Sequence, residues 1–367
     1  MTVPALDSIF SGLAAECLPG EQAELRVRII SQAGVPRWVL PENTRRAVTV
    51  LKSWKPYSAK SRLKWSAIVT SCRLNALAAL PGVGREVLHC DLSYWRRWLA
   101  GFSDSWAMVA YIGNPSPTRK AILFFVDEEA RVQAVAKVPI SRAARTAILN
   151  EANILTKLQS RLPLPRVLFL DEGEGIAAQS WMGGVNVSRS FGAEHLKLLT
   201  CFASESARIR LSDSREQLEE RVASLDSSVD SSLLSDALSS LEVRDELRAC
   251  VEHGDFAPWN LRRLADGRLA LIDWEWAVEE GLPWQDACRY FYMQDYLFRE
   301  SADVWKILMT NPLLEEYRRH FELSPEAVRG LTVRYLLRYL CEEHAEGNRG
   351  GAEYAARKIR EVLDSPK

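Results

Sequence analysis

The chain has 367 residues, of which 47% are hydrophobic and 26% are charged, and its formal net charge is -1. This length suits two or three domains, and the composition allows large buried cores and is ordinary for a soluble protein. The seven cysteines are scattered without a C-x-x-C pair, so neither a zinc site nor a disulfide framework is indicated. Because the sequence shows no secretory signal and no long apolar run, we expect a cytoplasmic protein that at most contacts a membrane peripherally.

Residues 1–105 are expected to form a basic, mainly helical accessory region. Two short runs, residues 23–30 and 37–40, alternate partly in the manner of strands. After them, apolar residues recur at helical intervals, with prolines as stops. The helices predicted from this spacing cover residues 45–55, 60–80 and 92–102.

The charge of this accessory region is uneven, since residues 43–85 contain nine basic residues and no acidic one. Trp54, Tyr57 and Trp65 are interleaved with the basic residues. Such a stretch can contact an anionic membrane surface, receive an anionic substrate, or form a solvated face whose tryptophans pack on the rest of the protein. Nucleic acid is not expected as a partner, because no recognised binding motif accompanies the charge.

Residues 106–183 are expected to form a small, strand-rich lobe. Residues 106–112 and 121–126 have the composition of strands, and the polar segment 113–119 joins them. Thr118 or the backbone amides of this segment could donate hydrogen bonds to phosphate oxygens. The segment has a single glycine and no P-loop pattern, so an ordinary turn explains it equally well.

Lys137 lies within an apolar strand predicted at residues 133–138. A lysine in that position is costly unless its charge is paired. The helix predicted to follow, residues 141–158, offers Glu151 as a partner. The alternative is that the side chain of Lys137 extends along the strand to reach solvent.

Residues 184–367 are expected to form a large, predominantly helical lobe that follows two more strands, residues 167–170 and 175–181. The helices predicted before the central motif span residues 194–209, 215–225 and 233–250. Those predicted after it span residues 286–298, 304–309, 313–321, 325–343 and 352–363.

The central motif runs from His253 to Asn260, and a short apolar strand after it ends at Asp273. Gly254 breaks regular structure in the motif, which therefore lies on a loop. An amide oxygen from Asn260 and a carboxylate from Asp273 can share one Mg²⁺ ion. Asp255 is then left to orient a hydroxyl group or to accept its proton. This order of a base, an asparagine and a metal-binding aspartate is typical of phosphoryl transfer.

The compound pattern, H-G-D-x-x-x-x-N followed by a turn and I-D-W-E, resembles the aminoglycoside phosphotransferase and choline kinase-like family. The resemblance covers residues 106–300 well and leaves residues 1–105 outside. It implies an α+β, two-lobed protein-kinase-like fold with a small antiparallel β lobe and a large helical lobe. The expected fold adds to these lobes the extra, mainly helical N-terminal region read from the residue pattern. It also implies that Asp255 meets the acceptor hydroxyl and that Asn260 and Asp273 hold Mg²⁺.

The same resemblance implies that Lys137 pairs with Glu151 and meets the phosphates of ATP or GTP. It places the hinge between the lobes and the adenine contacts near Trp181 and Met182, although both side chains could equally be part of the core. The family also has a short motif that anchors the metal-binding loop, and Asp286 matches it. A first-turn carboxylate of a helix is the alternative role for Asp286. His253 is expected to brace the loop.

The expected function is Mg²⁺-dependent transfer of the γ-phosphate of a nucleoside triphosphate to a hydroxyl group of a small molecule, such as a sugar, an aminoglycoside-like compound or an amino alcohol. Protein kinases carry H-R-D and A-P-E motifs that are absent here, which favours a small alcohol over a protein substrate. A protein kinase and a nucleotide-binding regulatory module that acts through its basic N-terminal region are the alternatives. The regulatory alternative is weakened because Lys137, Asp255, Asn260 and Asp273 are all present.

Overall fold

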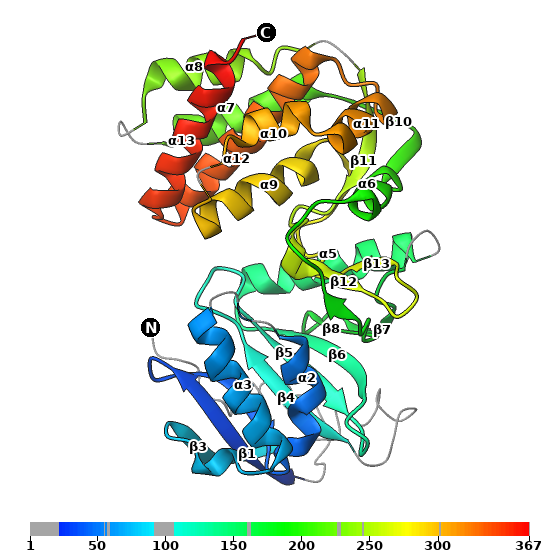
Figure 1. Ribbon diagram of the computed structural model, residues 1–367, viewed down its shortest axis with the longest axis vertical. Coiled ribbons are helices and arrows are strands. Elements are labelled where there is room, and N and C mark those ends of the chain that lie inside the picture. Colours follow the sequence, from blue (N-terminus) through cyan, green and yellow to red (C-terminus); the bar gives the residue numbers. More distant parts are fainter. Residues whose placement is uncertain are drawn as a thin grey trace. The chain divides into compact units, whose positions relative to one another are not determined.

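The structure is a computed structural model, and its chain forms two compact units (Figure 1). The first unit comprises residues 1–186 and 262–266, and the second comprises residues 187–261 and 267–367. The described residues are 22–54, 56, 59–91, 106–159, 163–225, 229–243, 246–300 and 302–366. The helix predicted at residues 92–102 lies outside them. None of the described helices is long and apolar enough to cross a membrane.

The described part of the first unit contains an eight-stranded sheet in the order β3-β1-β2-β4-β5-β6-β8-β7. Every neighbouring pair is antiparallel. Its strands are β1 (Gln22–Gln32), β2 (Val35–Pro41), β3 (Val83–Asp91), β4 (Ala107–Ile112), β5 (Lys120–Val126), β6 (Val132–Pro139), β7 (Val167–Asp171) and β8 (Ile176–Gln179). In a separate three-stranded sheet of order β13-β12-β9, β9 (Val185–Asn186) pairs with β12 (Leu261–Arg263), and β13 spans Leu269–Leu271.

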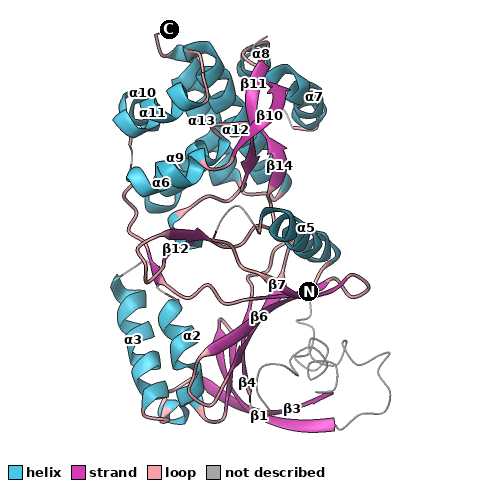
Figure 2. Cartoon of the chain, turned by 90° about the vertical axis from the view of Figure 1, so that its right-hand side faces the viewer, coloured by secondary structure: helices cyan, strands magenta, loops and turns pink. Residues whose placement is uncertain are grey.

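Two helices lie side by side on one face of this sheet (Figure 2). They are α2 (Val48–Ser53) and α3 (Ala59–Arg73), flanked by the short 3-10 helices η1 (Thr44–Ala47) and η2 (Leu77–Ala79). Trp38 of β2 is buried beneath them, and the indole of Trp65 donates a hydrogen bond to the carbonyl oxygen of Leu51 at 2.8 Å. Trp65 therefore packs on the sheet. This is the packing expected if the basic stretch is a solvated face whose tryptophans contact the rest of the protein.

The N-terminal region differs in one respect from the expected mainly helical structure. The strands predicted at residues 23–30 and 37–40 are present as β1 and β2, but the third strand, β3, was not predicted. Its hydrophobic pattern is weak, and Val87 at its centre is 44% exposed. Pairing with β1 along nine residues stabilises β3 instead, so this region contributes strands as well as helices.

The second unit is largely helical. Its helices are α6 (Ala193–Thr200), η3 (Leu211–Ser214), α7 (Arg215–Ala223), α8 (Ser231–Ser239), η4 (Pro258–Asn260), α9 (Gln285–Phe298), α10 (Val304–Thr310), α11 (Pro312–His320), α12 (Pro325–Ala345) and α13 (Arg349–Asp364). Where this unit is described, β10 (Ala203–Arg210), β11 (Glu246–Glu252) and β14 (Val278–Gly281) form an antiparallel sheet in that order. The short strand β13 (Leu269–Leu271) precedes the I-D-W-E sequence.

Two of the predicted helices were wrong in their second halves. Residues 203–209 and 246–250 belong to the strands β10 and β11, which pair with each other. Side-chain exposure alternates between half-buried and exposed along the second half of β10, which is the two-residue period of a strand. Cross-strand pairing therefore overrides the helical pattern there. This matters for function because β11 ends directly before His253.

Candidate active site

The imidazole of His253 holds the loop that follows β11. The backbone N–H of Asp255 donates to its Nδ1 at 3.1 Å, so Nδ1 carries a lone pair and the ring proton of the neutral tautomer is on Nε2. Nε2 lies 3.2 Å from the carbonyl oxygen of Ile272, to which it donates. The ring is fully buried and packs edge-on against Trp274. His253 thus ties the loop to the segment that leads to Asp273, which is the bracing role expected from the sequence.

Asp286, in the first turn of α9, anchors the same loop. Its carboxylate oxygens accept the backbone N–H groups of His253 and Gly254 at 2.7 and 3.0 Å. Burial and, less strongly, the charge of Glu252 raise the pKa of Asp286, while the two N–H groups lower it, and the resulting pKa is about 7. Asp286 therefore anchors the loop, as the resemblance implied, in addition to lying in the first turn of α9.

Gly254 is required for this loop to pack against the segment after Asp273. Its φ is +78°, a conformation that residues with a side chain rarely adopt. A Cβ atom at this position would lie 2.6 Å from the backbone oxygen of Trp276. This close approach explains the glycine between His253 and Asp255.

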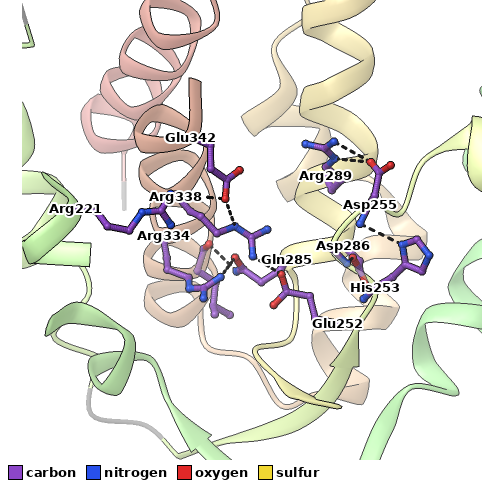
Figure 3. A network of polar contacts seen from close by, with 12 residues as sticks. Arg221, Glu252, His253, Asp255, Gln285, Asp286, Arg289, Arg334, Arg338 and Glu342 are labelled. Atoms are coloured by element: carbon purple, nitrogen blue, oxygen red, sulfur yellow. Dashed lines mark hydrogen bonds and ion pairs between the residues drawn. The ribbon is translucent and has the colours of Figure 1, made fainter. Parts of the chain in front are cut away.

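The carboxylate of Asp255 is held from two sides, as Figure 3 shows for one of them. Its Oδ2 accepts a hydrogen bond from Nδ2 of Asn260 at 2.7 Å. Its Oδ1 lies 2.9 Å from Nε and 2.8 Å from Nη2 of Arg289 on α9. The Asp255 side chain is 18% exposed, so the group is fixed but still accessible.

Arg289 was missed by the sequence reasoning, although a signal was present. It lies three residues after Asp286 on α9, and residues three apart occupy neighbouring positions on a helix surface. Once Asp286 is placed against the loop, Arg289 is placed near it too. Among the described residues, Arg289 is the basic residue that forms an ion pair with Asp255.

Asn260 and Asp273 are connected through the backbone. The Nδ2 group of Asn260 also donates to the backbone oxygen of Asp255 at 3.0 Å, so the side-chain oxygen is the atom left for a cation. The backbone N–H of Ile272 donates to the backbone oxygen of Asn260 at 3.0 Å, and Asp273 follows directly. Asp273 has a φ of +68°, which is uncommon for a residue other than glycine and costs energy.

The oxygen ligands offered by Asn260 and Asp273 suit Mg²⁺. This hard cation binds few protein groups and takes its other ligands from water and substrate phosphates. The described residues contain no cluster of three or more histidine, cysteine, aspartate or glutamate side chains that could hold a metal ion.

In the first unit, Lys137 and Glu151 form a buried ion pair. Nζ of Lys137 lies 2.6 Å from Oε2 of Glu151, and their side chains are 6% and 3% exposed. Lys137 is on β6, and Glu151 is on α5 (Arg142–Leu158), whose N-terminus is capped by Ser141. The pairing predicted from the sequence is present, and Lys137 does not extend to solvent.

The segment between β4 and β5 contains the predicted Thr118, which is half-buried. Beside it, Nε of Arg119 donates to the carbonyl oxygen of Gly113 at 3.2 Å. The Nη2 atom of Arg119 is buried without a hydrogen-bond partner among the residues that the structure describes. Arg119 was not predicted as a site residue.

Trp181 and Met182 follow β8 and are both half-buried. The ring of Trp181 packs edge-on against Phe124 of β5, with 5.9 Å between ring centroids. The first unit thus holds Lys137, Glu151, Thr118, Trp181 and Met182. The second unit holds the three predicted residues Asp255, Asn260 and Asp273, of which the first two are in direct contact.

Residues 122–330 match the model of the phosphotransferase enzyme family (APH). The chain belongs to this family. The match includes the Lys137–Glu151 pair and the loop from His253 to Asp273, and it excludes the N-terminal strands β1 to β3. The family predicted from the H-G-D and I-D-W-E pattern is confirmed. No curated protein matches the chain.

Solved structures of this family confirm the two-lobed, protein-kinase-like α+β fold. One is a ternary complex of a thermostable mutant of aminoglycoside phosphotransferase APH(4)-Ia with AMP-PNP and hygromycin B, at 17% identity and a TM-score of 0.52. It matches 74% of this chain and 98% of its own. Choline kinase LicA from Streptococcus pneumoniae gives 13% identity and a TM-score of 0.50, with the same two coverages. At these identities the likeness concerns the fold.

Proposed function

We propose that this phosphotransferase moves the γ-phosphate of ATP or GTP to a hydroxyl group of a small molecule in a Mg²⁺-dependent reaction. The observation that carries this proposal is the fixed but accessible position of the Asp255 carboxylate. Its carboxylate is accessible but clamped between Asn260 and Arg289, at the end of a loop that His253 and Asp286 hold in place. A carboxylate fixed in this way can orient an acceptor hydroxyl.

The two carboxylate oxygens of Asp255 have different tasks in this proposal. Oδ1 accepts two N–H groups from Arg289, whereas Oδ2 accepts one from Asn260 and keeps a lone pair. The acceptor hydroxyl donates to Oδ2, and its oxygen attacks the γ-phosphorus. The bond from that phosphorus to the bridging oxygen breaks, the nucleoside diphosphate leaves, and the hydroxyl proton passes to Oδ2.

The side-chain oxygens of Asn260 and Asp273 are proposed to hold Mg²⁺, which neutralises charge on the phosphates when bound. Because Asn260 also donates to Asp255, the residue links the cation site to the acceptor site. The strained backbone of Asp273 supports this role, since such conformations persist at functional positions where the surrounding structure holds them.

Lys137, fixed by Glu151, is proposed to contact the α- and β-phosphates of the nucleotide. Thr118 and the segment around it are proposed to cover the phosphates, and the buried Nη2 atom of Arg119 is a further donor for a phosphate oxygen. Trp181 and Met182 are proposed to pack against the purine. Residues 106–183 and 184–367 would then be the two kinase lobes, with residues 1–105 as an accessory region.

A coupled assay for nucleoside diphosphate release, run with Mg²⁺ over a panel of sugars, aminoglycosides and amino alcohols, tests the proposed function. We expect at least one compound to stimulate turnover above the rate with water, and Asp255→Asn to abolish that stimulation. Nucleotide binding without transfer to any compound would favour the regulatory module instead. Phosphate incorporation into proteins but not into small alcohols would favour a protein kinase.

A further inference from the structure

The helix α3 has one buried face and one outward face. Trp65, Val69 and Cys72 are directed to the sheet and belong to, or pack against, the core beneath α2 and α3. On the opposite side of the helix, Leu63 is 76% exposed. Leu74, whose N–H still bonds to the carbonyl oxygen of Thr70, is 68% exposed. Two large apolar side chains are therefore presented to solvent by a helix that already has a buried face.

These leucines lie on a single stripe. At about 100° per residue, Leu63, Ala67, Thr70 and Leu74 fall within a narrow sector of the helix surface. All four are exposed. The stripe points away from Cys72, which is fully buried. Its position on the helix excludes it from the core that α3 forms with the sheet.

Basic side chains border the stripe on both sides. Lys60 and Lys64 lie along one edge, and Arg62 and Arg73 lie along the other. All four are exposed, and none forms an ion pair with another described residue. Neither α2 nor α3 contains an acidic residue. The surface is thus apolar along its centre, positively charged along its edges, and free of carboxylates from its own helices.

We propose that this α3 face, made by Lys60, Arg62, Leu63, Lys64, Arg73 and Leu74, docks onto an anionic lipid surface. The basic side chains bind the lipid head groups, and the leucines enter the boundary between head groups and acyl chains. The aliphatic stems of the lysines and arginines cover the apolar stripe while their charged ends stay in the head-group region. A nucleic acid backbone would satisfy the charges but gives no role to the leucines.

Flotation with vesicles of phosphatidylcholine and phosphatidylserine at low salt tests the proposal, with pure phosphatidylcholine vesicles for comparison. The native protein should float with the anionic vesicles only. Lys60→Glu, Arg62→Glu and Lys64→Glu combined should weaken partitioning on the order of a hundredfold, since each basic residue near such a surface contributes separately. Carboxylates in the first turns of α3 are favoured by the helix dipole, so the variant should fold.

A matched control variant changes the net charge of the protein by the same amount, but at positions outside α3. Lys197→Glu, Lys306→Glu and Arg349→Glu combined replace three exposed basic residues of the second unit. This variant should keep vesicle binding within a few fold of the native protein. Equal losses in both variants would show that binding depends on net charge alone and would overturn the assignment to α3, as would absence of binding by the native protein.

The exposed leucines separate a lipid surface from a nucleic acid. Leu63→Ala combined with Leu74→Ala should lower vesicle partitioning at least several-fold and leave the melting temperature unchanged, because both side chains are exposed. Binding to a single-stranded oligonucleotide at the same salt should be weak and should not respond to the leucine change. Tight oligonucleotide binding, or vesicle binding that ignores the leucines, would overturn the lipid proposal.

Discussion

Arg289 of α9 binds one carboxylate oxygen of Asp255 through two nitrogen atoms, at 2.9 and 2.8 Å. Burial acts to lower the pKa of Arg289, but its interactions with Asp255 and Tyr335 outweigh burial, and the pKa is raised. Arg289 therefore stays a cation beside the proposed catalytic carboxylate. Such a partner fixes the orientation of the Asp255 carboxylate, which suits a group that positions the acceptor and takes its proton late.

Replacing Arg289 tests this positioning role. We expect Arg289→Ala to lower kcat by about 10- to 100-fold, the loss typical of a group that orients another functional group, while KM for the nucleotide changes little. Arg289→Lys should recover only part of the rate, because the flexible ammonium group of lysine cannot reproduce the two fixed contacts that the planar guanidinium makes with Oδ1 of Asp255. Added guanidinium ion at low concentration should partly restore Arg289→Ala. A rise in the nucleotide KM with unchanged kcat would contradict the role.

Asp286 makes stability depend on pH in a predictable direction. Its pKa is raised from 3.8 to about 7 in the folded protein, so the folded state binds more protons than the unfolded state between these values. Stability should therefore fall as the pH rises from about 4 to about 7, and this contribution should level off above that range.

The test is the melting temperature at pH 5 and pH 7.5 for the native protein and for Asp286→Asn. The native protein should lose more stability between the two conditions than the variant, which cannot titrate at this position. Asp286→Asn should also lower activity, because its amide nitrogen would face one of the two backbone N–H groups that hold the loop. An identical drop in melting temperature for both proteins would contradict the assignment.

The parts of the site that could be predicted from sequence are those set by local rules. Lys137 and Glu151 follow from a strand, a helix and the need to pair a buried charge. The loop from His253 to Asn260 follows from its glycine and its spacing. In each case the decisive information lies within a few tens of residues.

The parts that could not be predicted depend on packing between distant segments. The contact of Arg289 with Asp255 requires α9 to lie against the loop, and the sequence indicates it only through the three-residue spacing from Asp286. The strand β10 contains residues that also suit a helix, and only its pairing with β11 decides the outcome. Likewise, β3 is a strand because β1 pairs with it.

The Lys137–Glu151 pair should behave as a unit. We expect Lys137→Ala to raise the nucleotide KM and lower kcat, and Glu151→Ala to do so more weakly. Each single change leaves a buried charge without its partner, because the side chains are 6% and 3% exposed. The double variant should therefore lose less than the sum of the two single losses, by about 0.5–3 kcal/mol. Additive losses in this cycle would mean that the pair does not act together.

Asp273 offers a clean test of the cation site. Asp273→Asn keeps the shape of the side chain, and asparagine tolerates the positive φ of +68° at least as well as aspartate. The change therefore removes charge with little effect on the fold. It should raise the Mg²⁺ concentration that gives half-maximal rate by at least 10-fold. Asn260→Asp is no equivalent control, because it would place a carboxylate where Nδ2 now donates to Asp255.

An unchanged Mg²⁺ dependence in Asp273→Asn, with a melting temperature equal to that of the native protein, would remove Asp273 from the cation site. A loss of folding would instead show that the carboxylate of Asp273 makes contacts that the fold requires. The two outcomes are distinguished by circular dichroism before any kinetic measurement.

Asp255→Asn tests the centre of the proposed mechanism. The amide keeps one acceptor oxygen and the size of the side chain but loses the negative charge and the basicity. Positioned acid–base groups contribute about 10²- to 10⁴-fold to rate, so kcat should fall by that order. Nucleotide affinity, measured by calorimetry, should stay within a few fold, because Asp255 is not assigned to the cation or to the phosphates.

The same variant should be less stable, since it leaves the guanidinium of Arg289, whose side chain is 21% exposed, without its counter-ion. Removing the charge of both residues, in Asp255→Asn with Arg289→Met, should recover part of the melting temperature but none of the activity. Recovery of both would make the pair purely structural. Near-native turnover by Asp255→Asn would exclude it as the group that receives the acceptor proton, because an amide oxygen is too weak a base to replace a carboxylate in that step.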